Sequence, residues 1–161
     1  MCYIEKKIIS KNYIYLVTFI LICTKFLFSQ SNISYENSWA VVIGINNYQD
    51  ETITDLNYAV SDAQDIREML IEYYDFPAEN IVILLDDAAT LQGIKRSMDE
   101  LAKKSSENDR VLIYFAGHGK TKSLPNGGEE GYLIPVNGKS SDLFSTSLPM
   151  SEMKRVSDMM P

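Results

Sequence analysis

The chain has 161 residues, of which 45% are hydrophobic, and its formal net charge at pH 7 is −7. This length is enough to bury one hydrophobic core and not two. The acidic balance argues against nucleic acid or anionic lipid as a partner, because both repel a negatively charged surface. The sequence has neither a Walker loop nor a Gly-x-Gly-x-x-Gly motif, so nucleotide binding has no support.

Residues 1–30 differ in kind from the rest of the chain. Three lysines precede an apolar stretch over residues 13–23, and small or polar residues follow at 29–31. This order predicts a secretory signal peptide cleaved near residue 29 or 30, and therefore an exported protein, periplasmic or extracellular. The alternative is an uncleaved membrane anchor. Lys25 argues against it, because it ends the apolar run short of the roughly 20 residues that a span needs.

Loss of this segment changes the chemistry of the remaining chain. It takes away both cysteines, Cys2 and Cys23, together with four lysines and one glutamate, so the net charge becomes −10. A chain without cysteine has no disulfide framework and no thiolate metal site. The negative charge attracts basic substrates, although acidity alone more often serves solubility. We assign residues 31–38 to a linker and residues 39–161 to the folded domain.

From Trp39 onward, apolar runs alternate with amphipathic segments. The runs at 39–45, 81–85 and 111–116 have the unbroken hydrophobic character of strands buried on both faces of a parallel sheet. Helices are predicted between them, at about 56–74 and after Thr90, whose side chain can cap the second helix. This order predicts an α/β fold, a three-layer α/β/α sandwich with a mainly parallel sheet. The predicted apolar stripe of the first helix is Leu56, Ala59, Val60, Ala63, Ile66, Leu70 and Tyr73.

The pattern changes after residue 119. Residues 120–131 are polar and glycine-rich, and residues 131–135 form a short apolar run that ends at a proline. We expect a long loop closed by a small hairpin above a site. Met153, Val156 and Met160 then begin a third helix, and α/β order demands a further strand after it. We therefore expect the fold to be incomplete on its C-terminal side and the sequence to be the front part of a longer protein.

The third predicted strand leads into Gly117-His118-Gly119, which contains the only histidine of the chain. Ligands and catalytic groups gather beyond the carboxyl ends of parallel strands. The flanking glycines allow the backbone to turn and a substrate to approach closely. A histidine titrates near neutral pH and can act as general acid and general base. His118 is therefore a candidate catalytic residue; the alternative is a histidine with a structural role only.

Four segments occur in a characteristic order: Trp39-Ala-Val-Val-Ile-Gly-Ile-Asn46, Leu56-Asn-Tyr-Ala-Val-Ser-Asp-Ala63, Tyr114-Phe-Ala-Gly-His-Gly119 and Gly131-Tyr-Leu-Ile-Pro135. Together they resemble the caspase-like cysteine peptidases (peptidase family C14), and most closely the bacterial metacaspase-type members, or orthocaspases. The resemblance extends over residues 39–161. It implies a caspase-like fold, a cysteine-type endopeptidase activity and a polypeptide substrate.

The resemblance also implies roles for three residues. His118 matches the histidine of the Cys–His dyad, which protonates the leaving amine and then helps water attack the thioester. Gly119 matches the residue whose backbone N–H helps to hold the oxyanion. Asp62 matches the aspartate that lines the pocket for the P1 residue in metacaspases, where it favours Arg or Lys. Its place at the edge of the first helix's apolar stripe fits this role, and an ordinary solvated carboxylate is the alternative.

The nucleophile is the residue that the sequence does not supply. In caspases the cysteine follows the histidine by about 50 residues, which places it near position 168, beyond Pro161. We expect it to lie outside this chain, and the chain as it stands to be inactive. A hypothesis from another class is a catalytically dead pseudopeptidase that acts as a protein-interaction module.

Two acidic pairs have weaker functional interpretations. Asp86 and Asp87, after the second strand, resemble the Mg²⁺ site of a receiver domain, but a turn that closes a strand explains them better. Glu129 and Glu130 are candidate Ca²⁺ ligands, since some metacaspases bind Ca²⁺, but two adjacent acids on a loop are usually just exposed. We therefore expect no metal ligands and no cofactor, and Ca²⁺ dependence has no support in the sequence.

Overall fold

The computed structural model describes residues 35–160 except Asn126. The predicted signal peptide or anchor over residues 1–30 lies outside the described residues, as does Pro161. Across the part of the chain that is described, no helix is long and apolar enough to cross a membrane.

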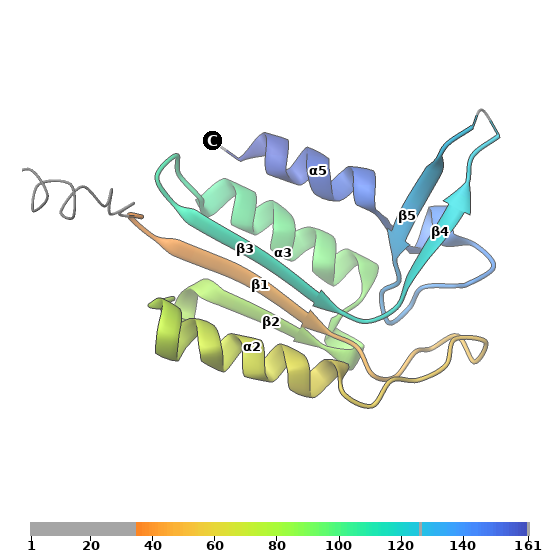
Figure 1. The fold of residues 1–161 in the computed structure, drawn as a ribbon, viewed down its shortest axis with the longest axis horizontal. Helices are drawn as coiled ribbons and strands as arrows, with labels where there is room; N and C mark the ends of the chain where they lie inside the picture. The colour runs from red at the N-terminus through yellow and green to blue at the C-terminus, as the bar shows by residue number, and fades with distance from the viewer. Residues whose placement is uncertain (1–34, 126, 161) are drawn as a thin grey trace, which may run out of the picture. The chain divides into compact units, whose positions relative to one another are not determined.

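Three parallel strands form the central sheet, in the order β2-β1-β3 (Figure 1). Their bounds agree with the predicted strands to within one residue. They are β1 (Ser38–Gly44), β2 (Ile81–Leu85) and β3 (Arg110–Ala116).

The sheet is covered on both faces (Figure 1). Val41 and Ile43 of β1 lie in a buried cluster with α3 (Leu91–Lys104) and α5 (Met150–Met159). The alternate residues of β1, Ala40 and Val42, pack with α2 (Ala59–Tyr74) on the other face. Because successive side chains of a strand point to opposite faces, β1 contributes to the buried cluster on each face of the sheet. The predicted three-layer α/β/α arrangement is confirmed.

Helix α2 begins three residues later than predicted. Asn46 determines this start from outside the helix: its side-chain oxygen accepts the N–H of Val60 at 3.2 Å, and its carbonyl oxygen accepts the N–H of Leu56 at 2.7 Å. Leu56 therefore belongs to the preceding loop. The predicted cap of α3 is confirmed, since the Thr90 hydroxyl accepts the N–H of Gly93 at 3.0 Å.

The last position of the predicted stripe on α2 is wrong, because Tyr73 is 75% exposed. The helix ends at Asp75, which has a left-handed backbone with φ of 56°. The chain reverses there, and the N–H of Phe76 returns to the carbonyl oxygen of Leu70. Phe76 is buried and fills the core position at this end of the helix.

A second, antiparallel sheet lies beyond the carboxyl end of β3 (Figure 1). It contains β4 (Gly119–Ser123), β5 (Glu129–Leu133) and the short β6 (Leu148–Pro149). The predicted hairpin is present, but its first strand occupies residues predicted as loop. The Lys-Thr-Lys-Ser sequence of β4 is exposed throughout, so it has no apolar alternation to indicate a strand. The remaining short helices are η1 (Ala78–Asn80), η2 (Asp86–Ala88) and α4 (Leu143–Thr146).

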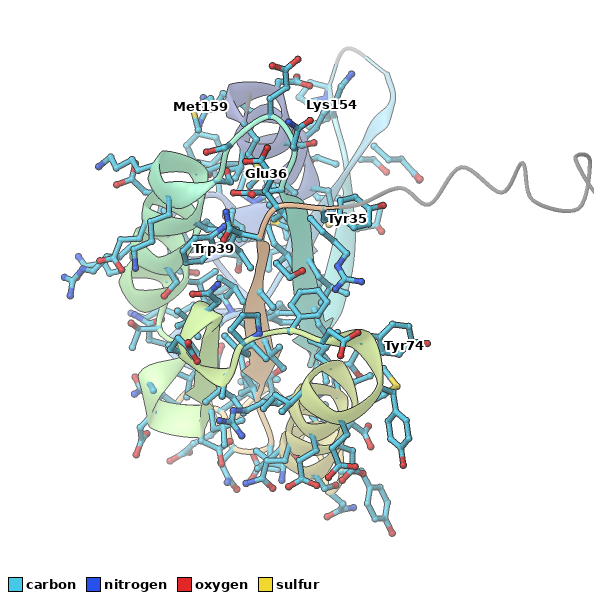
Figure 2. All side chains as sticks on the ribbon, turned by 90° about the vertical axis from the view of Figure 1, so that its left-hand side faces the viewer. Tyr35, Glu36, Trp39, Tyr74, Lys154 and Met159 are labelled. Atoms are coloured by element: carbon cyan, nitrogen blue, oxygen red, sulfur yellow. The ribbon has the colours of Figure 1, made fainter. Side chains whose placement is uncertain are left out.

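The amino edge of the central sheet is held by Asp109. Its carboxylate accepts hydrogen bonds from the backbone and side chain of Asn37, from the Trp39 indole at 3.0 Å and from the backbone of Ser106. Figure 2 views this edge, with Trp39 near the start of β1 and Tyr74 at the end of α2. This cluster fixes the entry of β1 beside β3, at the opposite end of the strands from His118.

Candidate active site

His118 directly follows β3, at the carboxyl edge of the central sheet. Its ring nitrogen Nε2 lies 2.7 Å from the carbonyl oxygen of Thr54, in the loop between β1 and α2. A carbonyl oxygen can only accept a hydrogen bond, so Nε2 carries the proton in the neutral ring. This tautomer leaves Nδ1 with a free lone pair, as a general base requires.

Tyr48 holds the backbone of the histidine. Its phenolic oxygen accepts the N–H of His118 at 2.7 Å, and the two rings lie 5.1 Å apart between centroids. Burial raises the pKa of Tyr48 more than this hydrogen bond lowers it, and the Asp86 carboxylate adds to the rise. The phenol therefore stays protonated at neutral pH. A Cβ at Gly117 would lie 2.8 Å from the same phenolic oxygen, so the glycine there makes room for Tyr48.

The backbone N–H of Gly119 points away from its partner strand. The N–H of Ile134 donates to the carbonyl oxygen of His118 at 2.9 Å, and Gly119 faces Leu133 in the ladder. In an antiparallel ladder this bond makes Gly119 and Leu133 a non-hydrogen-bonded pair. The ladder therefore leaves the Gly119 N–H unused, as the donor of an oxyanion site must be.

A cavity of about 220 Å³ opens beside the imidazole. It is lined by His118, by Gly119, which is predicted to hold the oxyanion, and by Thr54, whose carbonyl oxygen accepts the hydrogen bond from Nε2. A peptide group bound in this cavity would contact all three residues. The residues that line it are Thr52, Ile53, Thr54, His118, Gly119, Lys120, Ile134 and Ser140.

Asp62 does not line this cavity. It lies exposed in the first turn of α2. That turn is at the carboxyl edge of the sheet, because a Cβ on Gly44 at the end of β1 would lie 2.5 Å from the carbonyl oxygen of Ala59. The aspartate and the histidine thus share an edge of the fold, but Asp62 is not part of the cavity beside His118, and its role in P1 recognition stays a prediction.

Asp86, the first residue of the acidic pair after β2, has a structural role. The Asp86 carboxylate accepts the N–H groups of Asn46 at 2.7 Å and Asn47 at 3.0 Å, which fixes the chain leaving β1. Asp86 itself has a positive φ of 40° within η2. This agrees with the turn interpretation.

The pair on β5 does not fit a Ca²⁺ site. Glu129 and Glu130 are consecutive in a strand, so their side chains leave from opposite faces. Glu130 accepts the N–H of Ser151, at the start of α5, at 3.1 Å. Within residues 35–160, apart from Asn126, no group of three His, Cys, Asp or Glu side chains is arranged to hold a metal ion.

Sequence reasoning missed Tyr48 and Thr54, the two residues that hold the histidine. Both lie between the first predicted strand and the first predicted helix, where no site residue was predicted. Only Tyr48 could have been noticed in the sequence, because it is a large aromatic residue within the otherwise polar stretch Asn-Asn-Tyr-Gln-Asp, directly after a buried strand. Thr54 could not have been identified from the sequence, because it contacts His118 through its backbone carbonyl.

The caspase domain sequence model matches residues 37–156. Metacaspase-1A of Neurospora crassa is 31% identical over 124 residues, which cover 71% of this chain and 27% of that protein. Metacaspase-1B of Aspergillus oryzae is 35% identical over 112 residues, covering 63% and 26%. Metacaspase-3 of Arabidopsis thaliana is 30% identical over 108 residues, covering 61% and 29%.

The fold also matches a solved structure, protein GSU0716 from Geobacter sulfurreducens, with a TM-score of 0.63 and 19% identity over 77% of this chain and 46% of that one. This similarity concerns the fold alone. The chain spans less than a third of the length of the three metacaspases it is similar to. Because the caspase domain match covers residues 37–156, most of its length, this chain belongs to the caspase-like peptidase family C14.

Proposed function

We propose that this chain carries the histidine and the oxyanion donor of a cysteine endopeptidase. The observation that carries the proposal is the His118 ring, held through Nε2 by the Thr54 carbonyl with Nδ1 free, in one cavity with Gly119. The metacaspase relatives support the same reaction class.

The reaction would use these groups in two steps. A cysteine thiolate attacks the scissile carbonyl carbon, and the Gly119 N–H stabilises the oxyanion. Protonated His118 then donates its Nδ1 proton to the leaving amine as the C–N bond breaks. In the second step neutral Nδ1 takes a proton from water, whose oxygen attacks the thioester and releases the thiolate. One oxyanion donor typically contributes about 2.7–4 kcal/mol to transition-state stabilisation.

The nucleophile must come from outside residues 35–160, which contain no cysteine. We place it on a strand that pairs with the free side of β3. Two features support this placement: β3 is the edge strand of the described sheet, and its apolar residues are only partly buried. On this proposal the 161-residue chain by itself does not cleave peptides.

We further propose that the enzyme prefers Arg or Lys at P1. The support is Asp62 in the first turn of α2, at the same edge of the sheet as His118, in a chain of net charge −7. An exposed ion pair contributes only about 0.2–1 kcal/mol. Asp62 by itself therefore accounts for a preference of about 1.4- to fivefold, and not for an absolute one.

Export through residues 1–30 is a separate proposal, supported by the order of lysines, apolar residues and small polar residues there. N-terminal sequencing of the protein recovered outside the cytoplasm tests it. A mature chain that starts near residue 30 supports cleavage, and an intact Met1 contradicts it.

The test of activity uses the gene product that continues through a cysteine-bearing strand, with the 161-residue chain assayed beside it. We expect a higher kcat/KM for peptides with Arg or Lys at P1 than for matched peptides with Asp or Ala there. His118→Ala should lower kcat at least about a hundredfold. Asp62→Ala should lower kcat/KM on basic peptides about 1.4- to fivefold. Asp65→Ala is the matched control, because Asp65 is an exposed carboxylate of the same helix.

Faster cleavage after Asp than after Arg and Lys, or full activity of His118→Ala, contradicts the proposed function. Equal losses in Asp62→Ala and Asp65→Ala contradict only the P1 assignment. The competing hypothesis, a pseudopeptidase, rests on the absence of cysteine from residues 35–160. A gene that ends without a further cysteine would favour it.

A further inference from the structure

One carboxylate connects two loops that line the cavity beside His118. Asp50, in the loop between β1 and α2, accepts the N–H of Ser140 through Oδ2 at 2.8 Å. Through Oδ1 it accepts the N–H of Thr52 at 3.0 Å and the Thr52 hydroxyl at 2.7 Å. Ser140 lies in the loop after β5, 90 residues along the chain. We call the cluster of Asp50, Thr52 and Ser140 the loop latch.

The hydroxyls of the loop latch form a directed chain. The oxygens of Thr52 and Ser140 lie 2.7 Å apart. Thr52 already donates its hydroxyl proton to Asp50, so Ser140 must be the donor between the two hydroxyls. The Asp50 carboxylate at the end of this chain accepts three hydrogen bonds in all. These short, charge-assisted contacts fix both loops.

The loop latch is connected to His118 through the two residues that follow Thr52. Ile53 follows Thr52, donates its N–H to the carbonyl oxygen of Asp50 at 2.9 Å, and packs against the buried cluster of Tyr132, Ile134 and Leu143. The next residue is Thr54, whose carbonyl oxygen faces Nε2 of His118 at 2.7 Å. The position of that carbonyl is thus fixed by Asp50 on one side and by apolar packing on the other.

We propose that Asp50 is a positioning residue: through the loop latch it holds the Thr54 carbonyl against His118 and thereby keeps the imidazole in its Nε2–H tautomer with Nδ1 free. The meaning of this tautomer for catalysis rests on the proposed function, but the tautomer itself is a property of the present chain. Asp50 does not touch the ring and acts only through Thr54. Its carboxylate is ionised at neutral pH, because the hydrogen bonds from Thr52 and Ser140 lower its pKa to about 2.

The test uses the only histidine of the chain, whose ring signals need no further assignment. In ¹⁵N-labelled protein at about pH 8, the ring ¹⁵N shifts of the neutral imidazole report which nitrogen carries the proton. We expect the Nε2–H form in the unmodified chain. In Asp50→Ala and Thr52→Val the population of this form should fall, and the Nε2 proton should exchange with solvent about three- to tenfold faster.

Three further variants separate positioning from general stability. Thr52→Ser keeps the hydroxyl and should behave like the unmodified chain. Ser140→Ala removes one hydroxyl and keeps the backbone donor, so it serves if Asp50→Ala does not fold. Asp109→Ala is the matched control, because it removes a carboxylate of similar hydrogen bonding at the opposite edge of the sheet. It should leave the ring shifts unchanged.

Unchanged ring shifts and exchange in Thr52→Val and Ser140→Ala overturn the proposal, and so does an equal change in Asp109→Ala. The outcome is independent of peptidase activity. A longer gene product that proves inactive, while Asp50 still controls the tautomer, refutes the proposed function and leaves the positioning role intact.

Discussion

The carbonyl oxygen of Thr54 lies 2.7 Å from Nε2 of His118, although 64 residues separate them in the sequence. This contact joins the loop after β1 to the end of β3, two parallel strands that are neighbours in the sheet. It selects the tautomer of the only histidine in the chain. The histidine is therefore oriented by a backbone group, which no side-chain motif could have indicated.

Replacement of Tyr48 by Phe should free the backbone N–H of His118. The phenolic oxygen is its acceptor at 2.7 Å, and a partly buried donor without a partner costs about 1–3 kcal/mol of unfolding free energy. We expect faster hydrogen exchange at this amide, measured by NMR, and a lower urea midpoint. Tyr73→Phe is the control, because Tyr73 is 75% exposed. Equal effects of the two replacements would refute the role of Tyr48.

The Asp50 carboxyl should titrate at about pH 2 in the folded chain, against an ordinary value of 3.8. The cause is the hydrogen bonds from Thr52 and Ser140, which favour the ionised form. Because the folded pKa is the lower one, the carboxylate stabilises the fold above pH 3.8, and this contribution is lost as the pH falls to about 2. A ¹³C carboxyl titration measures the value. Thr52→Val should raise it and Thr52→Ser should not; identical titrations of all three proteins would contradict the loop latch.

A methyl group at Gly44 should destabilise the fold. Its Cβ would lie 2.5 Å from the carbonyl oxygen of Ala59 and 2.7 Å from the Cβ of Ala63, so β1 and α2 would have to separate. Overpacking of this kind typically costs about 1–3 kcal/mol of unfolding free energy, measured by urea denaturation. Gly119→Ala is the control, since its Cβ would meet only the Tyr132 carbonyl oxygen at 3.6 Å. A stable Gly44→Ala would show that α2 is not seated as described.

Trp39, the only tryptophan, should report the protonation of Asp109. Its indole donates to the carboxylate at 3.0 Å. Burial raises the pKa of Asp109, but the hydrogen bonds from Trp39, Ser106 and Asn37 together bring it below 3.8. The stabilisation therefore persists below pH 3.8 and is lost on further acidification. An acid titration of the fluorescence should have its midpoint below 3.8, and Asp109→Ala should abolish the transition. A midpoint above 3.8 would contradict the hydrogen-bonded cluster.

Much of the fold could be predicted because the relevant signals are local. The three strands of the central sheet are unbroken apolar runs, and the Thr90 cap of α3 requires only a hydroxyl three residues before its donor. The predictions were wrong where contacts with residues distant in the sequence determine the local structure. Asn46 sets the start of α2, and Phe76 replaces Tyr73 in the core after the chain reverses at Asp75. The residues of strand β4 were predicted as loop, because this strand is stabilised by backbone pairing with β5 and not by burial of its side chains.

The sequence by itself determined the alternation of strands and helices, the place of His118 at the end of an apolar strand and the glycines on either side of it. These depend on residue type and spacing along one segment. Only the tertiary structure decided what orients the imidazole: the Thr54 carbonyl, the Tyr48 phenol and the loop latch formed by Asp50, Thr52 and Ser140. Asp50 and Ser140 are 90 residues apart, and Thr54 acts through its backbone, which every residue shares. Such contacts exist only once parallel pairing has brought the carboxyl ends of β1 and β3 to one edge of the sheet.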